Sequence, residues 1–131
     1  RQVIGPYSGV IMKFIDRLRQ GKRLIIYGDG EQTRDFVHVK DIVEACMLAS
    51  KCKQCIGQAV NVGTGKPTAI GKLADVLAEF FETRVDPVYR ALRKGDVQHS
   101  YADISKAERM LGFKPKIKLK KGLEALVKGY M

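Results

Sequence analysis

The sequence contains no tryptophan and no apolar run near the roughly 20 residues that a membrane-spanning helix requires. It also shows no signal-peptide pattern, no low-complexity tract and no long internal repeat. We therefore expect a soluble cytoplasmic protein without a membrane partner. Its 131 residues, 45% of them hydrophobic, are enough for one globular domain with a real core.

Acidic side chains are scarce as well. The chain has 14 Asp and Glu against 24 Lys and Arg, which gives a formal net charge of +10. Such an excess suits nucleic acid, an anionic membrane surface or a phosphorylated small molecule. Lysines alternate with apolar residues near the C-terminus and predict an extended edge with one solvated face, a nucleic-acid patch being the alternative. These lysines are Lys114, Lys116, Lys118, Lys120 and Lys121.

Motifs for binding nucleotide phosphates are missing. No GxGxxG dinucleotide fingerprint occurs. The stretch "NVGTGKPT" resembles a phosphate-binding loop, but the GxxxxGK[ST] pattern needs glycine where Val60 stands and a hydroxyl where Pro67 stands. We interpret it as a strand-to-helix turn. Spacing alone reveals no nucleophile–base set and no metal-ligand cluster, so no residue of the chain is predicted to be catalytic or to bind a metal.

The cysteines and His38 have structural and functional interpretations. Cys46 lies in an apolar helical stretch and is expected to be a buried small hydrophobe. Cys52 and Cys55 form a CxxC, which could be a redox pair or half of a zinc site; incidental surface cysteines are favoured because no second ligand pair has suitable spacing. His38 has no visible partner, so a hydrogen-bonded structural histidine is favoured over a catalytic base.

Hydrophobic periodicity and turn residues predict an α/β chain with about five helices and short strands. Expected helices are 8–20, 41–51, 69–82, a short helix capped by Asp103 or Ser105 that runs through Leu111, and 120–131. Expected extended segments are 23–27, 35–39, 58–63 and 86–91. Gly5-Pro6 predicts an early turn, Gly21 and Gly112 predict helix ends, and Thr68 predicts a helix N-cap. The order lacks the regular alternation of a complete doubly wound sheet, so we expect a small mixed lobe rather than a whole nucleotide-binding fold.

Two arginines stand in polar loops beside aspartates. Arg34 follows "YGDGEQT" and precedes Asp35, whereas Arg93 stands in "RKGD", three residues before Asp96. A guanidinium offers a planar fork that suits phosphate oxygens, and two such groups on separate loops can bind one diphosphate. From the residues alone, two structural Arg–Asp pairs are an equal alternative.

Three stretches resemble one family in order and over nearly the whole chain. "YGDGEQTRDFVHVKDIVEA", "VNVGTGKPTAIGKLA" and "LRKGDVQHSYADISKAERMLGFKPKIKLKKGL" are similar to the carboxy-terminal part of nucleotide-sugar epimerases and dehydratases of the extended short-chain dehydrogenase/reductase family, with UDP-glucose 4-epimerase as the nearest type. The resemblance implies that residues 1–131 form the substrate-binding portion of a Rossmann-type epimerase. It also implies that the amino-terminal NAD-binding Rossmann domain of that family is absent from this chain.

The resemblance also implies roles for five residues. Arg34 matches the pyrophosphate-binding arginine of the family's "RDF". Arg93 and Asp96 match its "RxGD" loop, whose arginine binds phosphate and whose aspartate binds ribose. Tyr27 would place its ring against the nucleotide base, and the Ile25 backbone would contact a base edge.

The resemblance further implies an NAD-dependent parent enzyme, an epimerase or dehydratase acting on a UDP-sugar, which we expect to be a homodimer without a nucleic-acid partner. NAD would be bound by the missing domain. The catalytic Tyr-x-x-x-Lys pair is missing too, since Tyr101 and Lys106 stand five residues apart. We therefore expect this chain to bind substrate but to be inactive alone. A basic nucleic-acid-binding module is the alternative function.

Overall fold

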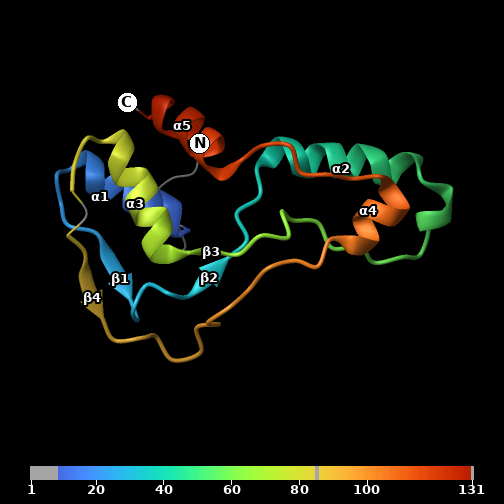
Figure 1. Ribbon diagram of the computed structural model, residues 1–131. Coiled ribbons are helices and arrows are strands. Elements are labelled where there is room, and N and C mark those ends of the chain that lie inside the picture. The colour runs from blue at the N-terminus through green and yellow to red at the C-terminus, as the bar shows by residue number, and fades with distance from the viewer. Residues whose placement is uncertain (1–8, 85, 131) are drawn as a thin grey trace. The chain divides into compact units, whose positions relative to one another are not determined.

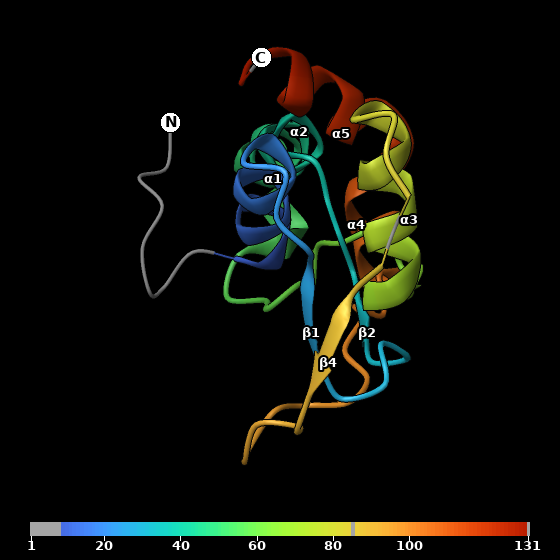
Figure 2. The same ribbon diagram turned by 90° about the vertical axis from the view of Figure 1, so that its left-hand side faces the viewer.

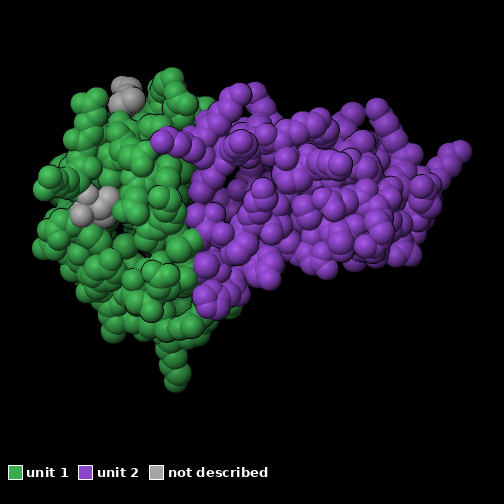
Figure 3. Space-filling view, viewed as in Figure 1, with its two compact units in different colours: residues 1–32, 69–98, 123–131 green, residues 33–68, 99–122 purple. Residues whose placement is uncertain are grey.

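The computed structural model describes residues 9–84 and 86–130, which contain five α-helices and four short strands. The predicted early turn at Gly5-Pro6 lies outside these residues. The mixed α/β class is confirmed. The chain divides into two compact units: unit 1 comprises 1–32, 69–98 and 123–131, and unit 2 comprises 33–68 and 99–122 (Figure 3). No helix among the described residues is long and apolar enough to cross a bilayer.

Unit 1 is built on a parallel pair of strands beside two helices that pack against each other (Figures 1 and 2). Its elements are α1 (Val10–Arg19), β1 (Ile25–Tyr27), α3 (Ile70–Phe80), β4 (Val88–Arg90) and most of α5 (Leu119–Lys128). Apolar residues at helical spacing on α1 and α3 are buried, as the periodicity predicts. The core of unit 1 includes Met12, Phe14, Ile15, Leu24, Ile26, Leu73, Leu77, Leu123 and Val127.

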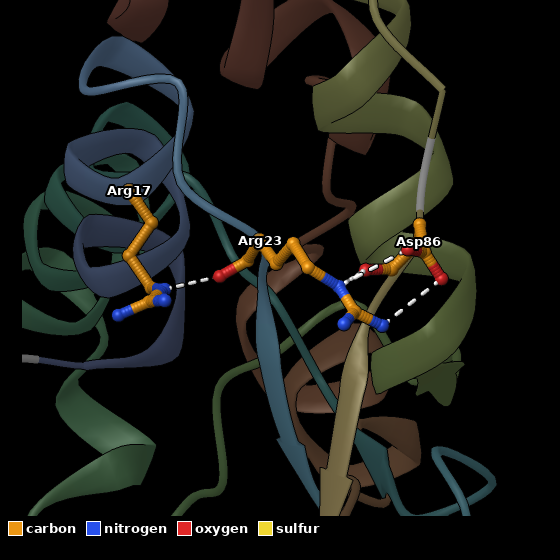
Figure 4. Close-up of polar contacts among 3 residues, drawn as sticks. All are labelled: Arg17, Arg23 and Asp86. Atoms are coloured by element: carbon orange, nitrogen blue, oxygen red, sulfur yellow. Dashed lines mark hydrogen bonds and ion pairs between the residues drawn. The ribbon is translucent and has the colours of Figure 1, made fainter.

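An ion pair lies just before both strands of this sheet (Figure 4). Arg23 Nε is 3.1 Å from Asp86 Oδ2, and its Nη2 donates to Oδ1 at 3.1 Å. Arg17 Nε donates in turn to the Arg23 carbonyl. Arg23 and Asp86 each stand two residues before a register partner, Ile25 and Val88, so the pair favours the observed alignment. Because both side chains are exposed, we expect a contribution of at most about 1 kcal/mol.

Unit 2 is built around α2 and α4, which pack together on a small apolar cluster. Its elements are β2 (Thr33–Arg34), α2 (Val39–Lys51), the 3₁₀-helix η1 (Lys53–Cys55) and α4 (Ser105–Leu111). Strand β3 (Thr68–Ala69) pairs with β2. The cluster consists of Ala45, Ala107 and Phe113, flanked by Leu48, Val60, Val62 and Leu111. Helix α4 ends at Gly112, whose φ of 64° is the left-handed conformation that the sequence predicts.

The expected strand 35–39 is wrong, because α2 already begins at Val39. His38 is its N-cap, and the His38 Nδ1 atom accepts the Lys40 backbone N–H at 3.1 Å. This bond satisfies one of the orphan N–H groups of the first helical turn. The structural interpretation of His38 is thereby confirmed.

Two other local predictions are also wrong. Residues 58–63 form no strand, because a strand requires a hydrogen-bonded neighbour and the described part of the chain supplies none beside them. Thr68 does not cap α3: it belongs to β3, and Ala69 is the N-cap residue.

The cysteines differ from expectation. Cys46 is exposed rather than buried, and its neighbour Val43 is 56% exposed, because α2 buries its other face around Asp41 and Ala45. Cys52 and Cys55 are joined in a disulfide and are therefore not incidental surface thiols.

Asp41 is a charged residue that is buried in the core, with 2% of its surface exposed. Its Oδ1 accepts the Lys116 backbone N–H at 3.1 Å, and its Oδ2 accepts that of Ile117 at 3.2 Å. A carboxylate in the first turn of α2 thus holds the segment that follows α4. Buried carboxylates persist only when such donors replace the water that they lose.

We predict that Asp41→Ala lowers the free energy of unfolding by about 3 kcal/mol, because two N–H groups lose a charged acceptor. Urea unfolding followed by far-ultraviolet circular dichroism measures the change. Glu44→Gln is the matched control: it breaks only the exposed Lys116–Glu44 ion pair and should change stability by at most about 0.5 kcal/mol. Equal losses in the two variants would contradict the assigned role of Asp41.

Candidate functional site

Tyr27 and Arg93, two of the predicted site residues, are in direct contact in unit 1. The Arg93 guanidinium carbon lies 3.8 Å from the centre of the Tyr27 ring, a cation–π contact. Tyr27 is the last residue of β1, and the loop that follows β4 carries Arg93 back to it. The strand pairing therefore determines where this arginine lies.

Charge and hydrogen bonding shift the titration of both groups. A side-chain hydrogen bond from Arg93 lowers the pKa of the Tyr27 phenol from its ordinary value, and the charge of Arg90 adds to this. The same hydrogen bond raises the pKa of Arg93, and the charge of Asp96 acts in the same direction. Arg90, the register partner of Tyr27, is a candidate that the sequence analysis missed. Only the pairing of β1 with β4 reveals it.

Asp96 lies beside Arg93 through a tight turn. The Asp96 N–H donates to the Arg93 carbonyl at 3.1 Å, and Gly95 has a φ of 88°, as the third position of a type II turn requires. Residues 91–100 are all exposed. The "RKGD" loop thus presents a guanidinium and a carboxylate together to solvent.

The Ile25 backbone faces the open edge of β1. Val88 N–H donates to the Leu24 carbonyl and Gly28 N–H to the Arg90 carbonyl, both at 2.8 Å. In a parallel pair only alternate residues of a strand bond to one neighbour. The backbone groups of Ile25 therefore point away from β4, where a planar ring with donors and acceptors at its rim can pair with them.

Arg34 lies in unit 2, on β2. Its Nη1 donates to the Thr33 carbonyl at 2.7 Å, and its side chain lines a cavity of about 400 Å³ together with Asn61, Ser100 and Tyr101. This volume falls within the range of small-ligand sites. Asn61 and Tyr101 are polar groups at this cavity that spacing in the sequence did not single out.

Asp35, next to Arg34, closes the neighbouring loop. Its carboxylate accepts the backbone N–H groups of Thr64 and Gly65 at 3.0 Å and that of Ala102 at 3.3 Å. A Cβ on Gly63 would stand 2.5 Å from Asp35 Oδ2, so only glycine fits there. The Asp35 carboxylate thus joins β2 to two later segments of unit 2.

The same contacts show that loop 63–65 does not bind phosphate. The Thr64 and Gly65 N–H groups already bind the Asp35 carboxylate, so the stretch is a structural turn, although no strand precedes it among the described residues. With no glycine-rich fingerprint elsewhere, the described residues do not fit NAD. They also contain no group of three or more His, Cys, Asp or Glu placed to hold a metal ion.

Comparison with known proteins gives the family. The chain matches the family model described as GDP-mannose 4,6-dehydratase over residues 5–126. It belongs to this family. It is 42% identical over 120 residues to a putative UDP-glucose 4-epimerase of Methanocaldococcus jannaschii, covering 92% of this chain and 38% of that protein. The resemblance to nucleotide-sugar epimerases and dehydratases is thereby confirmed.

Solved structures of family members agree with this assignment. UDP-glucose 4-epimerase of Thermotoga maritima, solved with UDP-glucose, is 38% identical with a TM-score of 0.86, covering 96% of this chain and 41% of that one. UDP-glucuronic acid 4-epimerase of Bacillus cereus, solved with UDP-glucuronic acid and NAD, is 27% identical with a TM-score of 0.86, covering 95% and 41%. Other relatives are named decarboxylases. The chain spans about two fifths of the length of the proteins it matches.

We predict that Arg93→Ala raises the pKa of Tyr27 toward its ordinary value of about 10, because the guanidinium that stabilises the phenolate is removed. The ring carbon shift of Tyr27, followed by NMR against pH, measures it. Arg19→Ala, which removes an equal charge from the end of α1, is the control and should leave this pKa unchanged. Equal shifts in the two variants would show that net charge, not the contact, is responsible.

Proposed function

We propose that this chain is the nucleotide-sugar-binding lobe of an NAD-dependent epimerase, most similar to UDP-glucose 4-epimerase, and that it binds the nucleoside diphosphate of a UDP-sugar. The observation that carries the proposal is the Tyr27–Arg93–Asp96 arrangement: a half-buried aromatic ring in contact with an exposed guanidinium, and an exposed carboxylate in the same turn as that guanidinium. These are the groups that a base, a phosphate and a ribose require. UDP-sugars in the structures of relatives support it.

Each residue has a proposed role that follows from its chemistry. Tyr27 stacks on the base, while the open backbone edge of Ile25 pairs with the rim of that base. Arg93 binds a phosphate oxygen and Asp96 accepts from a ribose hydroxyl. Arg34 binds the pyrophosphate at the cavity that it lines in unit 2.

The chemical step lies outside this chain. NAD, which accepts and returns a hydride in oxidoreductive sugar chemistry, would be held by a dinucleotide-binding domain of the parent protein. The residues described here bind and orient the substrate. We therefore propose that the isolated chain is inactive and that the parent, as a homodimer, isomerises the sugar.

The lysine-rich segment 114–121 does not favour the alternative function, nucleic-acid binding. Lys114, Lys116 and Lys118 are exposed while the residues between them are half-buried, so they form one solvated face as predicted. Lys116 already pairs with Glu44 at 2.6 Å. No aromatic side chain stands among these lysines for bases to stack on.

We predict that Arg34→Ala and Arg93→Ala each weaken UDP-glucose binding by about 1.5–3 kcal/mol, the value of a charge-assisted hydrogen bond. Calorimetry on the whole protein that carries this chain measures it. Arg109→Ala in unit 2 and Arg19→Ala in unit 1 remove the same charge from exposed helical positions and should leave the affinity unchanged.

Replacement by lysine separates charge from geometry. Arg93→Lys should restore only part of the affinity, because an ammonium cannot form the planar fork. Unchanged affinity in both alanine variants would overturn the assigned site. Oligonucleotide binding that survives loss of Arg34 and falls steeply with salt would favour the nucleic-acid alternative.

A further inference from the structure

The CxxC pair of unit 2 has no part in the proposed function. Cys52, the C-cap residue of α2, is joined by a disulfide to Cys55, the last residue of η1. Both cysteines are half-buried, so a reagent in solution can reach the bond. Among the described residues, neither belongs to a group of three or more side chains placed to hold a metal ion. The zinc interpretation of this motif is therefore not supported, and the redox interpretation is the one to examine.

The disulfide does little to stabilise the fold. A disulfide stabilises a protein mainly by restricting the unfolded chain, and this effect grows with the number of residues in the closed loop. Cys52 and Cys55 stand only three residues apart, so their loop is among the shortest that a disulfide can close. A structural crosslink would gain far more by joining distant segments of unit 2.

The backbone holds the two cysteines together without help from the sulfur atoms. The Cys55 N–H donates to the Cys52 carbonyl at 3.1 Å, and the Ile56 N–H donates to the Lys53 carbonyl at 3.3 Å. The two cysteine Cα atoms are 5.3 Å apart, within the range of about 4.4–6.8 Å that disulfides require. These turn hydrogen bonds persist when the S–S bond opens. The two thiols then stay within reach of each other, and the disulfide can form again.

The reduced state has a hydrogen bond that the oxidised state lacks. Cys52 Sγ lies 3.5 Å from the carbonyl oxygen of Met110. Met110 is in the last turn of α4, where carbonyls have no N–H partner within the helix. A disulfide sulfur carries no hydrogen, whereas a thiol is a weak donor. Reduction therefore supplies the end of α4 with a donor, which offsets part of the loss of the S–S bond.

The charge around the pair favours thiol chemistry. Exposed Lys51 and Lys53 flank Cys52, and the sequence has no Asp or Glu between Glu44 and Asp75. The thiolate is the form that attacks or leaves in disulfide exchange, and neighbouring ammonium groups stabilise it.

We propose that Cys52 and Cys55 are a reversible dithiol–disulfide site that a dithiol reductant opens, and that the reduced Cys52 thiol then bonds to the Met110 carbonyl. A thiolate of the reductant attacks Cys55 Sγ, because Cys52 Sγ lies against α4. The S–S bond breaks, and Cys52 leaves as a thiolate and takes a proton. The second thiol of the reductant then displaces Cys55, which is protonated, and closes the reductant's own disulfide. Two electrons and two protons thus pass from the dithiol to the protein.

Equilibration with dithiols tests the site in the whole protein that carries this chain. The folded protein is incubated with mixtures of reduced and oxidised dithiothreitol or lipoate, quenched with acid and alkylated in urea, and its peptides are mapped by mass spectrometry. We expect the reduced fraction of Cys52 and Cys55 to rise from about one tenth to about nine tenths over about a 100-fold change in the dithiol-to-disulfide ratio. Protein that starts oxidised and protein that starts reduced should reach the same fraction. Cys46, a free thiol, is the internal control and should be alkylated at every ratio.

Two variants test the contact with α4. Cys52→Ala and Cys55→Ala both abolish the disulfide and remove one thiol, but only Cys52→Ala removes the donor to Met110. Amide exchange of Gly112 and Phe113, whose N–H groups are hydrogen-bonded at the end of α4, reports on this contact. In Cys55→Ala we expect the rates of the reduced unchanged protein. In Cys52→Ala we expect rates about fivefold higher, the effect of one lost hydrogen bond. Circular dichroism checks that both variants fold.

Three outcomes would contradict the proposal. A bond that opens only after unfolding in urea would make the pair a structural crosslink. Thiols that stay reduced in every mixture would show that no redox couple exists. Equal exchange in the two variants would overturn the bond from Cys52 to Met110. None of these measurements uses UDP-glucose, so their results are independent of the proposed function.

Discussion

The carboxylate of Asp35 is the contact on which the form of unit 2 depends. It accepts N–H groups from Thr64, Gly65 and Ala102, which lie about 30 and 67 residues further along the chain. This one carboxylate thus joins β2 to two later segments of unit 2. It also explains why Gly63 carries no side chain, because a Cβ there would collide with the carboxylate. The adjacent Arg34 is positioned by this arrangement.

Asp41 works in the same way on the other side of His38. Its burial would be costly without the two backbone N–H groups of Lys116 and Ile117. Two of the chain's 14 acids thus accept hydrogen bonds from its own backbone. The chain's excess of Lys and Arg over Asp and Glu favours an anionic ligand.

The sequence predicts the helices and helix ends, which depend on local periodicity and turn residues. It fails for strands and side-chain burial, which depend on a neighbouring segment of the fold. Helix α1 ends before Gly21 and α4 ends at Gly112, because each glycine adopts the left-handed conformation at low cost. The strand predicted at 58–63 has the right alternation, yet strands exist only in pairs. The sequence predicts a buried Cys46 because an apolar residue on a helix is usually buried, whereas the exposed Val43 shows that α2 has a second apolar face. Family resemblance singled out Tyr27 and Arg93, but their contact and the proximity of Arg90 depend on strand register.

Under the proposed function, the two arginines are held by different kinds of support. Arg93 rests on an aromatic ring at the end of a strand, whereas Arg34 precedes a carboxylate that is bound to backbone. Neither the Tyr27 ring nor the Asp35 carboxylate is assigned a contact with the sugar that the enzyme would convert. Such a lobe recognises what nucleoside diphosphate sugars share, a base and a diphosphate, and leaves the sugar to be distinguished elsewhere. This division explains how 4-epimerases and decarboxylases can carry closely similar lobes, since changing the reaction does not require changing how the nucleotide is bound.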